Sequence, residues 1–316
     1  MKTHYLLFLF VFSTSYSQIA GCTDSLSINY NKNAAVNNGS CNYKSAKIKA
    51  VTTSKLPISI KETSGLIYYN ELLWTFNDDS DTQLYGLDTS GKIIKTVTIN
   101  NVTNTDWEAI TQDSTHIYIG DFGNNVSGNR DDLHILKIAK KSLFEQKQQI
   151  DTIWFSYDDQ DNLKSVKANT TNFDCEALII KNGSIYLFSK QWSAGATTLY
   201  KLPNVAGKQI ATKIATLDVK GLITDAHYDA IKNAIVLSGY SKTLQPFIYL
   251  LSHFEGNNFF SGNKRKIKLR LPFHQVEGIT SPDGLDYYIS NEQFTRKPFL
   301  NIPQQLHLID LRKYIY

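Results

Sequence analysis

Five copies of one short motif divide most of this chain into segments of similar length. Each copy is an acidic or hydroxyl residue, then a tiny residue, then usually an aliphatic one: Ser64-Gly65-Leu66, Glu108-Ala109-Ile110, Glu176-Ala177-Leu178, Asp225-Ala226-His227 and Glu277-Gly278-Ile279. The steps between copies are 44, 68, 49 and 52 residues. Self-similarity at such a period is typical of solenoids and propellers. The chain is therefore expected to fold as a ring or stack of repeated units.

Repeat two shows what each unit contains. Its apolar pattern predicts strands at 107–111, 116–120, 133–138 and 150–156. Four antiparallel strands make one propeller blade, and the tiny residues would let the innermost strands crowd the axis. We therefore predict an all-β, five-bladed β-propeller. Six blades are the alternative, because the long second step could contain another blade.

The last repeat has only three predicted strands, whereas an additional predicted strand, Lys47 to Thr52, precedes the first copy of the motif. We predict that this N-terminal strand completes the last blade, so that the ring has no free edge. The propeller would then span residues 46–316.

The first residues have the features of a targeting signal. Lys2 and His4 precede an apolar run, and small residues follow it, which predicts a signal peptide over residues 1–17. No later stretch is long and apolar enough to span a bilayer. We expect an exported protein that is periplasmic, displayed at the cell surface or secreted, with a lipid anchor on Cys22 as the alternative.

Residues 18–45 are rich in Asn, Ser and Gly and contain two of the three cysteines. The stretch resembles a short extracellular motif of exported proteins of the Bacteroidetes group, with its opening Gly-Cys-Thr-Asp and closing Gly-Ser-Cys. In an oxidising compartment Cys22 and Cys41 are expected to form a disulfide. Asp24 and nearby Asn side chains offer oxygens for calcium, but a stapled linker is the simpler interpretation. Cys175 is expected to be a small buried apolar residue.

The formal net charge is only +4, and basic residues are scattered. The densest basic run, 264–270, alternates with Ile267 and Leu269, as in a strand with one solvated face. Nucleic acid is therefore not an expected partner. We expect a monomer whose partner is a small molecule, a polymer or a surface protein.

The first motif column places five oxygen-bearing side chains beside the predicted channel: Ser64, Glu108, Glu176, Asp225 and Glu277. Four unpaired carboxylates in one small space would repel each other strongly. A bound cation would relieve this, and Ca²⁺ suits such oxygen ligands, whereas His and Cys are too few for zinc. The alternative is that these carboxylates cap backbone amides and share no ion.

The second strand of each blade should return to the face that carries this ring. Residues that end it are predicted ligand contacts: Asp121, Phe122, Trp192, Tyr240 and Asn291. If the site is catalytic, Asp78 or Glu292 would position water, and Lys190 or Arg296 would offset negative charge. His227 and His274 flank ring positions and are candidate bases.

The ring resembles that of the calcium-activated soluble nucleotidases, or apyrases, which are five-bladed propellers with one calcium in the central channel. That family orders its ligands Ser, Glu, Glu, Ser, Glu, and this chain has the same order except for Asp225. The resemblance spans about residues 47–316. Where the family has Asp-Asp-Arg-Thr-Gly, this chain has Asp78-Asp79-Ser80-Asp81-Thr82 and lacks the Arg. We therefore favour a calcium-centred binding module. The alternatives are a calcium-dependent hydrolase of nucleotides or other phosphoesters and a lactonase-type propeller.

Overall fold

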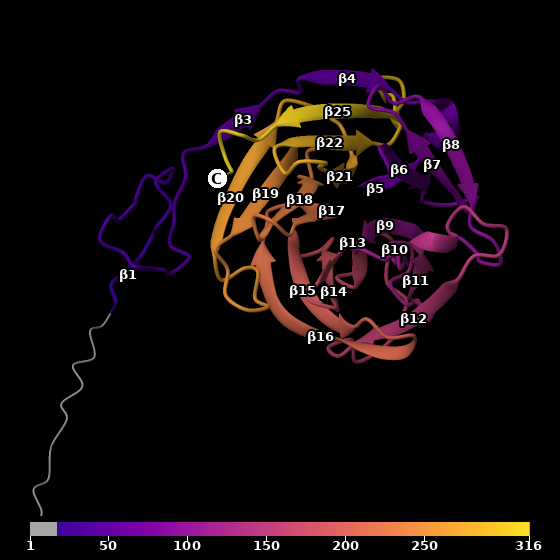
Figure 1. Cartoon of the computed structure of the whole chain (residues 1–316), viewed down its shortest axis with the longest axis horizontal. Helices are drawn as coiled ribbons and strands as arrows, with labels where there is room; N and C mark the ends of the chain where they lie inside the picture. The colour runs from indigo at the N-terminus through magenta and orange to yellow at the C-terminus, as the bar shows by residue number, and fades with distance from the viewer. Residues whose placement is uncertain (1–17, 316) are drawn as a thin grey trace, which may run out of the picture.

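A computed structural model describes residues 18–315, and its strands form a ring of five antiparallel sheets around a central axis (Figure 1). The sheets are blades 1 to 5 in chain order, and the first strand of each is the innermost. Blade 1 contains β5 (Thr63–Tyr69), β6 (Leu72–Asn77), β7 (Gln83–Leu87) and β8 (Ile93–Thr98). Blade 2 contains β9 (Trp107–Gln112), β10 (His116–Asp121), β11 (His134–Ala139) and β12 (Ile150–Tyr157). Blade 3 contains β13 (Asp174–Lys181), β14 (Ser184–Lys190), β15 (Ala196–Pro203) and β16 (Gly207–Asp218).

Blade 4 contains β17 (Leu222–Asp229), β18 (Ala234–Tyr240), β19 (Pro246–Ser252) and β20 (Asn263–Leu269). Blade 5 contains β21 (Val276–Thr280), β22 (Asp286–Asn291), β25 (Gln305–Asp310) and β4 (Thr52–Lys55). The remaining elements are short: β1 (Ala20–Gly21), β2 (Val36–Asn37), β3 (Ala46–Ile48), η1 (Ile58–Ile60), η2 (Lys140–Ser142), β23 (Phe294–Arg296) and β24 (Leu300–Ile302). The predicted five-bladed propeller is confirmed. The extra residues between blades 2 and 3, 158–173, contain no strand, so there is no sixth blade.

Five hydrophobic clusters join the blades, one at each interface between neighbours. Between blades 1 and 2, for example, Phe76 meets Trp107 edge to face with ring centroids 5.5 Å apart. Because each blade is covered on both faces, inner strands are apolar on both sides, and β21 is buried at every residue. Blades 2 and 3 are also joined by parallel pairing of β12 with the first half of β16.

The innermost strands approach closely, which explains the tiny residue in each motif. A Cβ on Gly278 would lie 2.9 Å from the backbone carbonyl carbon of Gly65 in blade 1 and 2.5 Å from Ser290 Oγ. Contacts at this distance leave no room for a side chain. The glycine therefore sets how tightly blades 5 and 1 meet at the axis.

An N-terminal strand closes the ring, as predicted, but the predicted span is a few residues too early. β4, at Thr52–Lys55, pairs with β25 of blade 5, whereas β3, at Ala46–Ile48, lies parallel to β20 of blade 4. Apolar anchors set these two registers: Ile48 packs in the cluster between blades 4 and 5, and Leu56 packs between blades 5 and 1.

A buried histidine ties the closing strand to its blade. His307 Nε2 lies 2.8 Å from Asn291 Oδ1, and Nδ1 lies 2.9 Å from Thr53 Oγ1. Asn291 Oδ1 can only accept, so Nε2 carries the proton and the Thr53 hydroxyl donates to Nδ1. Burial, with a smaller contribution from His274, lowers the pKa of His307 to about 3.

This depressed pKa predicts acid sensitivity at the closure. The unfolded chain takes up a proton below the ordinary pKa of 6.5, while the folded chain does not until about pH 3, so stability falls as pH drops through this window. The expected loss between pH 8 and pH 5 is about 2 kcal/mol from this residue. His307→Gln should flatten the pH dependence of urea unfolding by that amount. An unchanged slope in the variant would contradict this.

The stapled N-terminal segment lies outside the ring, beside β3 and β20 (Figure 1). The predicted disulfide between Cys22 and Cys41 is confirmed, so the Cys22 sulfur is not free to carry a lipid. Asp24 Oδ1 accepts the amide of Leu26, and Asn31 Oδ1 accepts that of Asn33. These oxygens are committed to local turns, which favours the stapled-linker interpretation. The predicted signal peptide, residues 1–17, lies outside the described residues.

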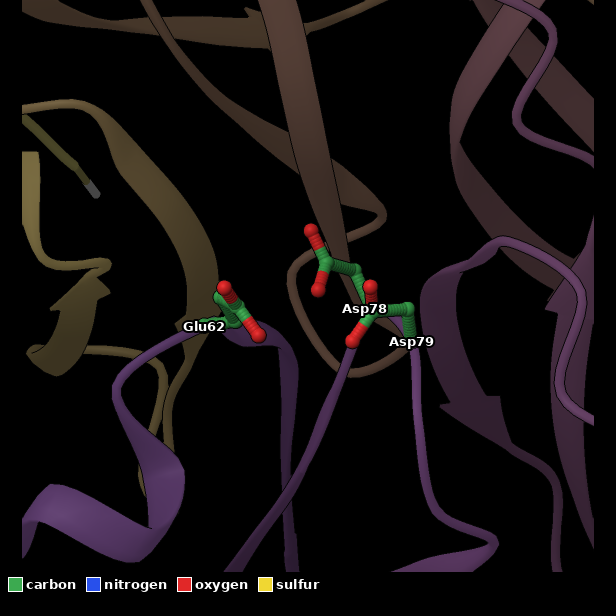
Figure 2. A group of neighbouring side chains, drawn as sticks. All are labelled: Glu62, Asp78 and Asp79. Carbon is green, nitrogen blue, oxygen red and sulfur yellow. The ribbon is translucent and has the colours of Figure 1, made fainter.

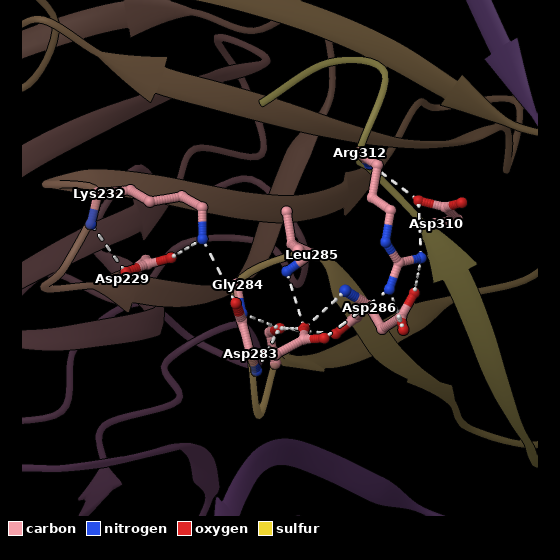
Figure 3. Close-up of polar contacts among 9 residues, drawn as sticks. Asp229, Lys232, Asp283, Gly284, Leu285, Asp286, Asp310 and Arg312 are labelled. Atoms are coloured by element: carbon pink, nitrogen blue, oxygen red, sulfur yellow. Dashed lines mark hydrogen bonds and ion pairs between the residues drawn. The ribbon is translucent and has the colours of Figure 1, made fainter. Parts of the chain in front are cut away.

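The far face of the propeller, opposite the ring of motif residues, is held by charged turns (Figure 3). Asp283 Oδ1 accepts the amides of Leu285 and Asp286, each at 2.8 Å, as expected for the predicted turn between β21 and β22. Lys232, from the turn of blade 4, reaches Asp229 at 3.2 Å and the Asp283 carbonyl at 3.3 Å.

Within residues 18–315 no helix is long and apolar enough to cross a membrane.

Candidate functional site

β-Bulges aim the motif side chains toward the axis. In blades 2, 3 and 5 the residue skipped by the strand pairing is Glu108, Glu176 and Glu277, respectively. A bulge leaves one residue unpaired and redirects its side chain. The acidic motif residue of these three blades is therefore placed in the same way by the same backbone device.

Blade 4 departs from the predicted alignment by one residue. Here the bulged residue is Thr224, and Asp225 pairs with Ser238, where blades 2, 3 and 5 have their tiny residue. Thr224 Oγ1 donates to the Val276 carbonyl at 2.6 Å, much as Ser64 Oγ donates to the Glu108 carbonyl at 3.0 Å. The ring thus reads Ser64, Glu108, Glu176, Thr224 and Glu277, with hydroxyls in blades 1 and 4.

Asp225 is fully buried and does not reach the ring-face cavity. Its Oδ1 accepts the amide of Ala226 at 2.8 Å, and its Oδ2 accepts that of Ile279 at 2.7 Å. Burial raises its pKa well above the ordinary value, although these amides oppose the shift. Asp225 therefore caps backbone amides near the axis and is not placed to bind an ion in the cavity.

A polar cavity of about 210 Å³ opens on the ring face. Six carboxylates and one ammonium line it, together with two aromatic rings and several polar groups: Glu62, Thr63, Ser64, Asp78, Glu108, Asn125, Asn169, Glu176, Lys190, Trp192, Tyr240, Gln275, Glu277 and Glu292. Nine of these residues are among those predicted from the sequence. A larger hollow of about 880 Å³ lies at the outer edge of blade 3, but its lining contains no carboxylate.

Lys190 neutralises the wall formed by blades 3 and 4. Its Nζ lies 2.6 Å from Glu176 Oε1, and it also faces the rings of Trp192 at 4.9 Å and Tyr240 at 5.6 Å. Burial alone would lower the pKa of Lys190, but Glu176 and the neighbouring acids hold it well above the ordinary value. The lysine is a buried ion-pair partner, not a free cation for an incoming phosphate.

On the wall formed by blades 5 and 1 the buried carboxylates have no such partner among the described residues, whereas Glu62 pairs with the exposed Lys61 at 2.9 Å. Within the described chain, Asp78 Oδ1 and Glu277 Oε2 are buried and accept no hydrogen bond. Burial, then the neighbouring acids, raises the pKa of Asp78 to about 7. Burial also raises the pKa of Glu277 to about 8, although Lys190 opposes the shift. Carboxyl oxygens of Glu62, Asp78 and Asp79 lie within 4.8 Å of one another (Figure 2).

Four other predicted site residues lie elsewhere. Asp121 is fully buried, where it binds Arg130 at 2.7 Å, and Phe122 packs in the core between blades 2 and 3. Asn291 is buried and bonds to His307 and to two carbonyls. Arg296 is exposed on the β23–β24 hairpin and does not line the cavity. Asp121, Phe122 and Asn291 thus lie outside the cavity lining, because Asp121 and Asn291 turn inward to hold loops and Phe122 packs in the core.

The candidate bases also lie outside this cavity. His227 lines a hollow of about 110 Å³ on the axis, beyond the tight contacts of the innermost strands, and burial lowers its pKa to about 4. His274 bonds to the Pro272 carbonyl and to Gln305 Oε1. Neither imidazole is placed to act on a ligand in the cavity.

Sequence reasoning missed Glu62 and Gln275, although a signal was present. Two residues before the ring position, four of five blades carry a carboxylate or an amide: Glu62, Asp106, Asp174 and Gln275. Asp174 accepts the indole N–H of Trp192 at 2.6 Å and so orients that ring beside the cavity. Asn125 and Asn169 come from loops 123–130 and 158–172, which bond to each other, and no periodic signal marks them.

No protein-family model and no curated protein matches the sequence. Among solved structures, a streptogramin B lyase is similar at 11% identity and a TM-score of 0.41, over 83% of this chain and 87% of that one. A mitotic checkpoint complex chain is similar at 11% identity and a TM-score of 0.35, over 78% of this chain and 60% of that one. These similarities are too weak to argue function, and the fold rests on the sheet topology of the chain itself.

Proposed function

We propose that this protein is an exported binding propeller whose ligand sits over the ring-face cavity, with a calcium ion held by the cavity carboxylates. The observation that carries this proposal is Glu277, which is buried at the cavity with one carboxylate oxygen that nothing in the described chain satisfies. Leaving such a group unpaired is costly, whereas an oxygen-binding cation would satisfy it. The excess of six carboxylates over one ammonium supports the same view.

Several features suit a binding role. The disulfide in the N-terminal segment is typical of proteins made for oxidising compartments. Trp192 and Tyr240 line the cavity, and so do the amides of Asn125 and Asn169. Such mixed aromatic and polar surfaces are common where proteins hold a ligand or partner.

Calcium should stabilise the fold by mass action. Because the ion would bind only the folded chain, calcium at 100-fold above its Kd is expected to add about 2.7 kcal/mol, and chelator should remove that gain. Glu277→Gln should lose most of the shift in melting temperature. Glu145→Gln, an exposed site far from the cavity, is the matched control. A melting temperature that changes with neither calcium nor chelator would refute the calcium centre.

A calcium-dependent hydrolase is the second candidate, because Asp78 and Glu292 could act as bases near neutral pH. Burial, followed by nearby acids, raises the pKa of Asp78 to about 7, and burial raises that of Glu292 to about 7 against the pull of Lys190. Two observations favour binding instead: Lys190 is already paired, and 210 Å³ is below the roughly 300 Å³ of ordinary small-ligand pockets.

A phosphate-release screen over nucleoside di- and triphosphates separates the two candidates. We expect no calcium-dependent release. Turnover that disappears in Asp78→Ala, in a variant that still melts cooperatively, would establish the hydrolase instead; Lys190→Ala is read only alongside its melting temperature, because it breaks a buried ion pair.

A further inference from the structure

The carboxylates of the cavity are not equivalent, and this bears on where a cation would bind. On the side of blades 3 and 4, Glu176 has an ion-pair partner in Lys190, whose ammonium is covered by Trp192 and Tyr240. The hydroxyls of Ser64 and Thr224 donate to carbonyls of neighbouring blades. A symmetric ring of five ligands around the axis therefore does not fit these residues.

On the side of blades 5 and 1 the ion pair of Glu62 with Lys61, at 2.9 Å, is weaker, because both side chains are partly exposed to solvent. Glu62, at the entry to β5, and Asp78 and Asp79, at the exit of β6, bring carboxyl oxygens within 4.8 Å of one another, and Figure 2 shows the three converging. Independently, Glu277 of β21 is 93% buried and directs an unsatisfied oxygen into the same cavity that Glu62 and Asp78 line. Its neighbours there include Glu292, whose Oε1 already accepts Gln275 Nε2 at 2.5 Å.

We infer that the cation site lies off the axis, between blades 5 and 1, with Glu62, Asp78 and Glu277 as its ligands. Glu277 lies outside the group of oxygens within 4.8 Å of one another, so its side chain must turn toward Glu62 and Asp78 to bind. The inference rests on the proposed calcium centre but changes its ligands, because only Glu277 belongs to the ring that the sequence predicts. Three carboxylates from two blades, with backbone or water oxygens completing the shell, are a normal set for Ca²⁺. On the side of blades 3 and 4, the ammonium of Lys190 then balances the charge of Glu176 in place of a metal ion.

Terbium luminescence tests this location directly. Tb³⁺ resembles Ca²⁺ in size and ligand preference, and Trp192 lines the same cavity, so energy transfer from its indole should report binding. Emission that rises to saturation and is displaced by calcium is the expected result for the full chain. Calorimetric titration with calcium alone gives the affinity without the probe.

The variants separate the two locations. Glu62→Gln and Asp78→Asn keep the side-chain shape and should each weaken calcium binding about 10-fold or more, since even outer-sphere partners of a metal cost that much. Glu108→Gln, the matched change on the axial ring, should leave the affinity within about 2-fold. Melting in chelator checks that each variant is folded, and if one of the first pair is not, the other carries the test.

Two outcomes would overturn the inference in different ways. If Glu108→Gln abolishes binding while Glu62→Gln and Asp78→Asn do not, the ion sits on the axis, and the calcium centre stands without the off-axis site. If the unaltered chain shows neither saturable emission nor heat with calcium, the calcium centre itself is wrong and this site falls with it.

Discussion

A chain that begins after Leu56 should not form a stable propeller, whereas one that begins at Ser45 should melt within a few degrees of residues 18–316. The longer deletion removes β4, so the pairing of Thr52–Lys55 with β25 is lost and a central strand becomes an edge. It also removes Leu56, which is buried between blades 5 and 1, and the Thr53 hydroxyl that bonds His307. Burial of one leucine alone stabilises a fold by about 1.5–3 kcal/mol.

The shorter deletion removes the stapled segment, which contacts the ring from outside at blade 4 and contributes no strand to any blade. Asn37 Nδ2 donates to Asn263 Oδ1 at 2.9 Å, and the ring of Tyr43 lies 4.8 Å from the Arg265 guanidinium. Thermal unfolding of the three lengths, followed by circular dichroism, gives the comparison. Because domains have only about 5–15 kcal/mol of stability in total, the longer deletion should leave little cooperative melting. Equal melting of the two truncated chains would show that β4 does not close the ring.

The fold was predictable because the repeat is strong and local. Hairpin turns such as Asn182-Gly183, and apolar strands that fill both faces of a blade, repeat five times, and each copy supports the others. The closing strand was placed a few residues early because 46–55 contains two short strand-forming pieces. Only the packing of Ile48 and Leu56 decides which piece pairs with which blade.

The site was predictable only in part, because bulges and ion pairs depend on tertiary structure. A motif search aligns Asp225 with the ring glutamates, but a bulge one residue earlier puts Thr224 there instead. Nothing local says that Lys190, at the end of β14, will turn in and pair with Glu176. The polar residues two positions before the ring, which begin with Glu62, do recur along the sequence. Aligning the residues that precede each copy of the motif would have found them.

Lys190→Met is the point substitution with the largest expected effect on stability. Lys190 is 4% exposed and Glu176 is 1% exposed, so removing the ammonium leaves a buried carboxylate without its partner. Breaking a buried pair in this way typically costs about 3–5 kcal/mol. Methionine preserves the length and the contact with Trp192 and Tyr240, so the loss reports the charge and not the packing.

The same substitution should become milder when its partner is neutral. Lys190→Met combined with Glu176→Gln replaces the pair by uncharged groups of similar size, and its unfolding free energy should return to within about 1 kcal/mol of the unaltered chain. Acid should help the single variant too: burial raises the pKa of Glu176, so the folded variant binds a proton more readily than the unfolded chain, and its loss of stability should be smaller at pH 5 than at pH 8. Urea unfolding of the four proteins of this cycle, in chelator at both pH values, measures the coupling. Two results would contradict this: a single variant whose unfolding free energy falls by less than about 1 kcal/mol, or a double variant that regains none of the loss. Either would mean that Lys190 does not stabilise the charged form of Glu176.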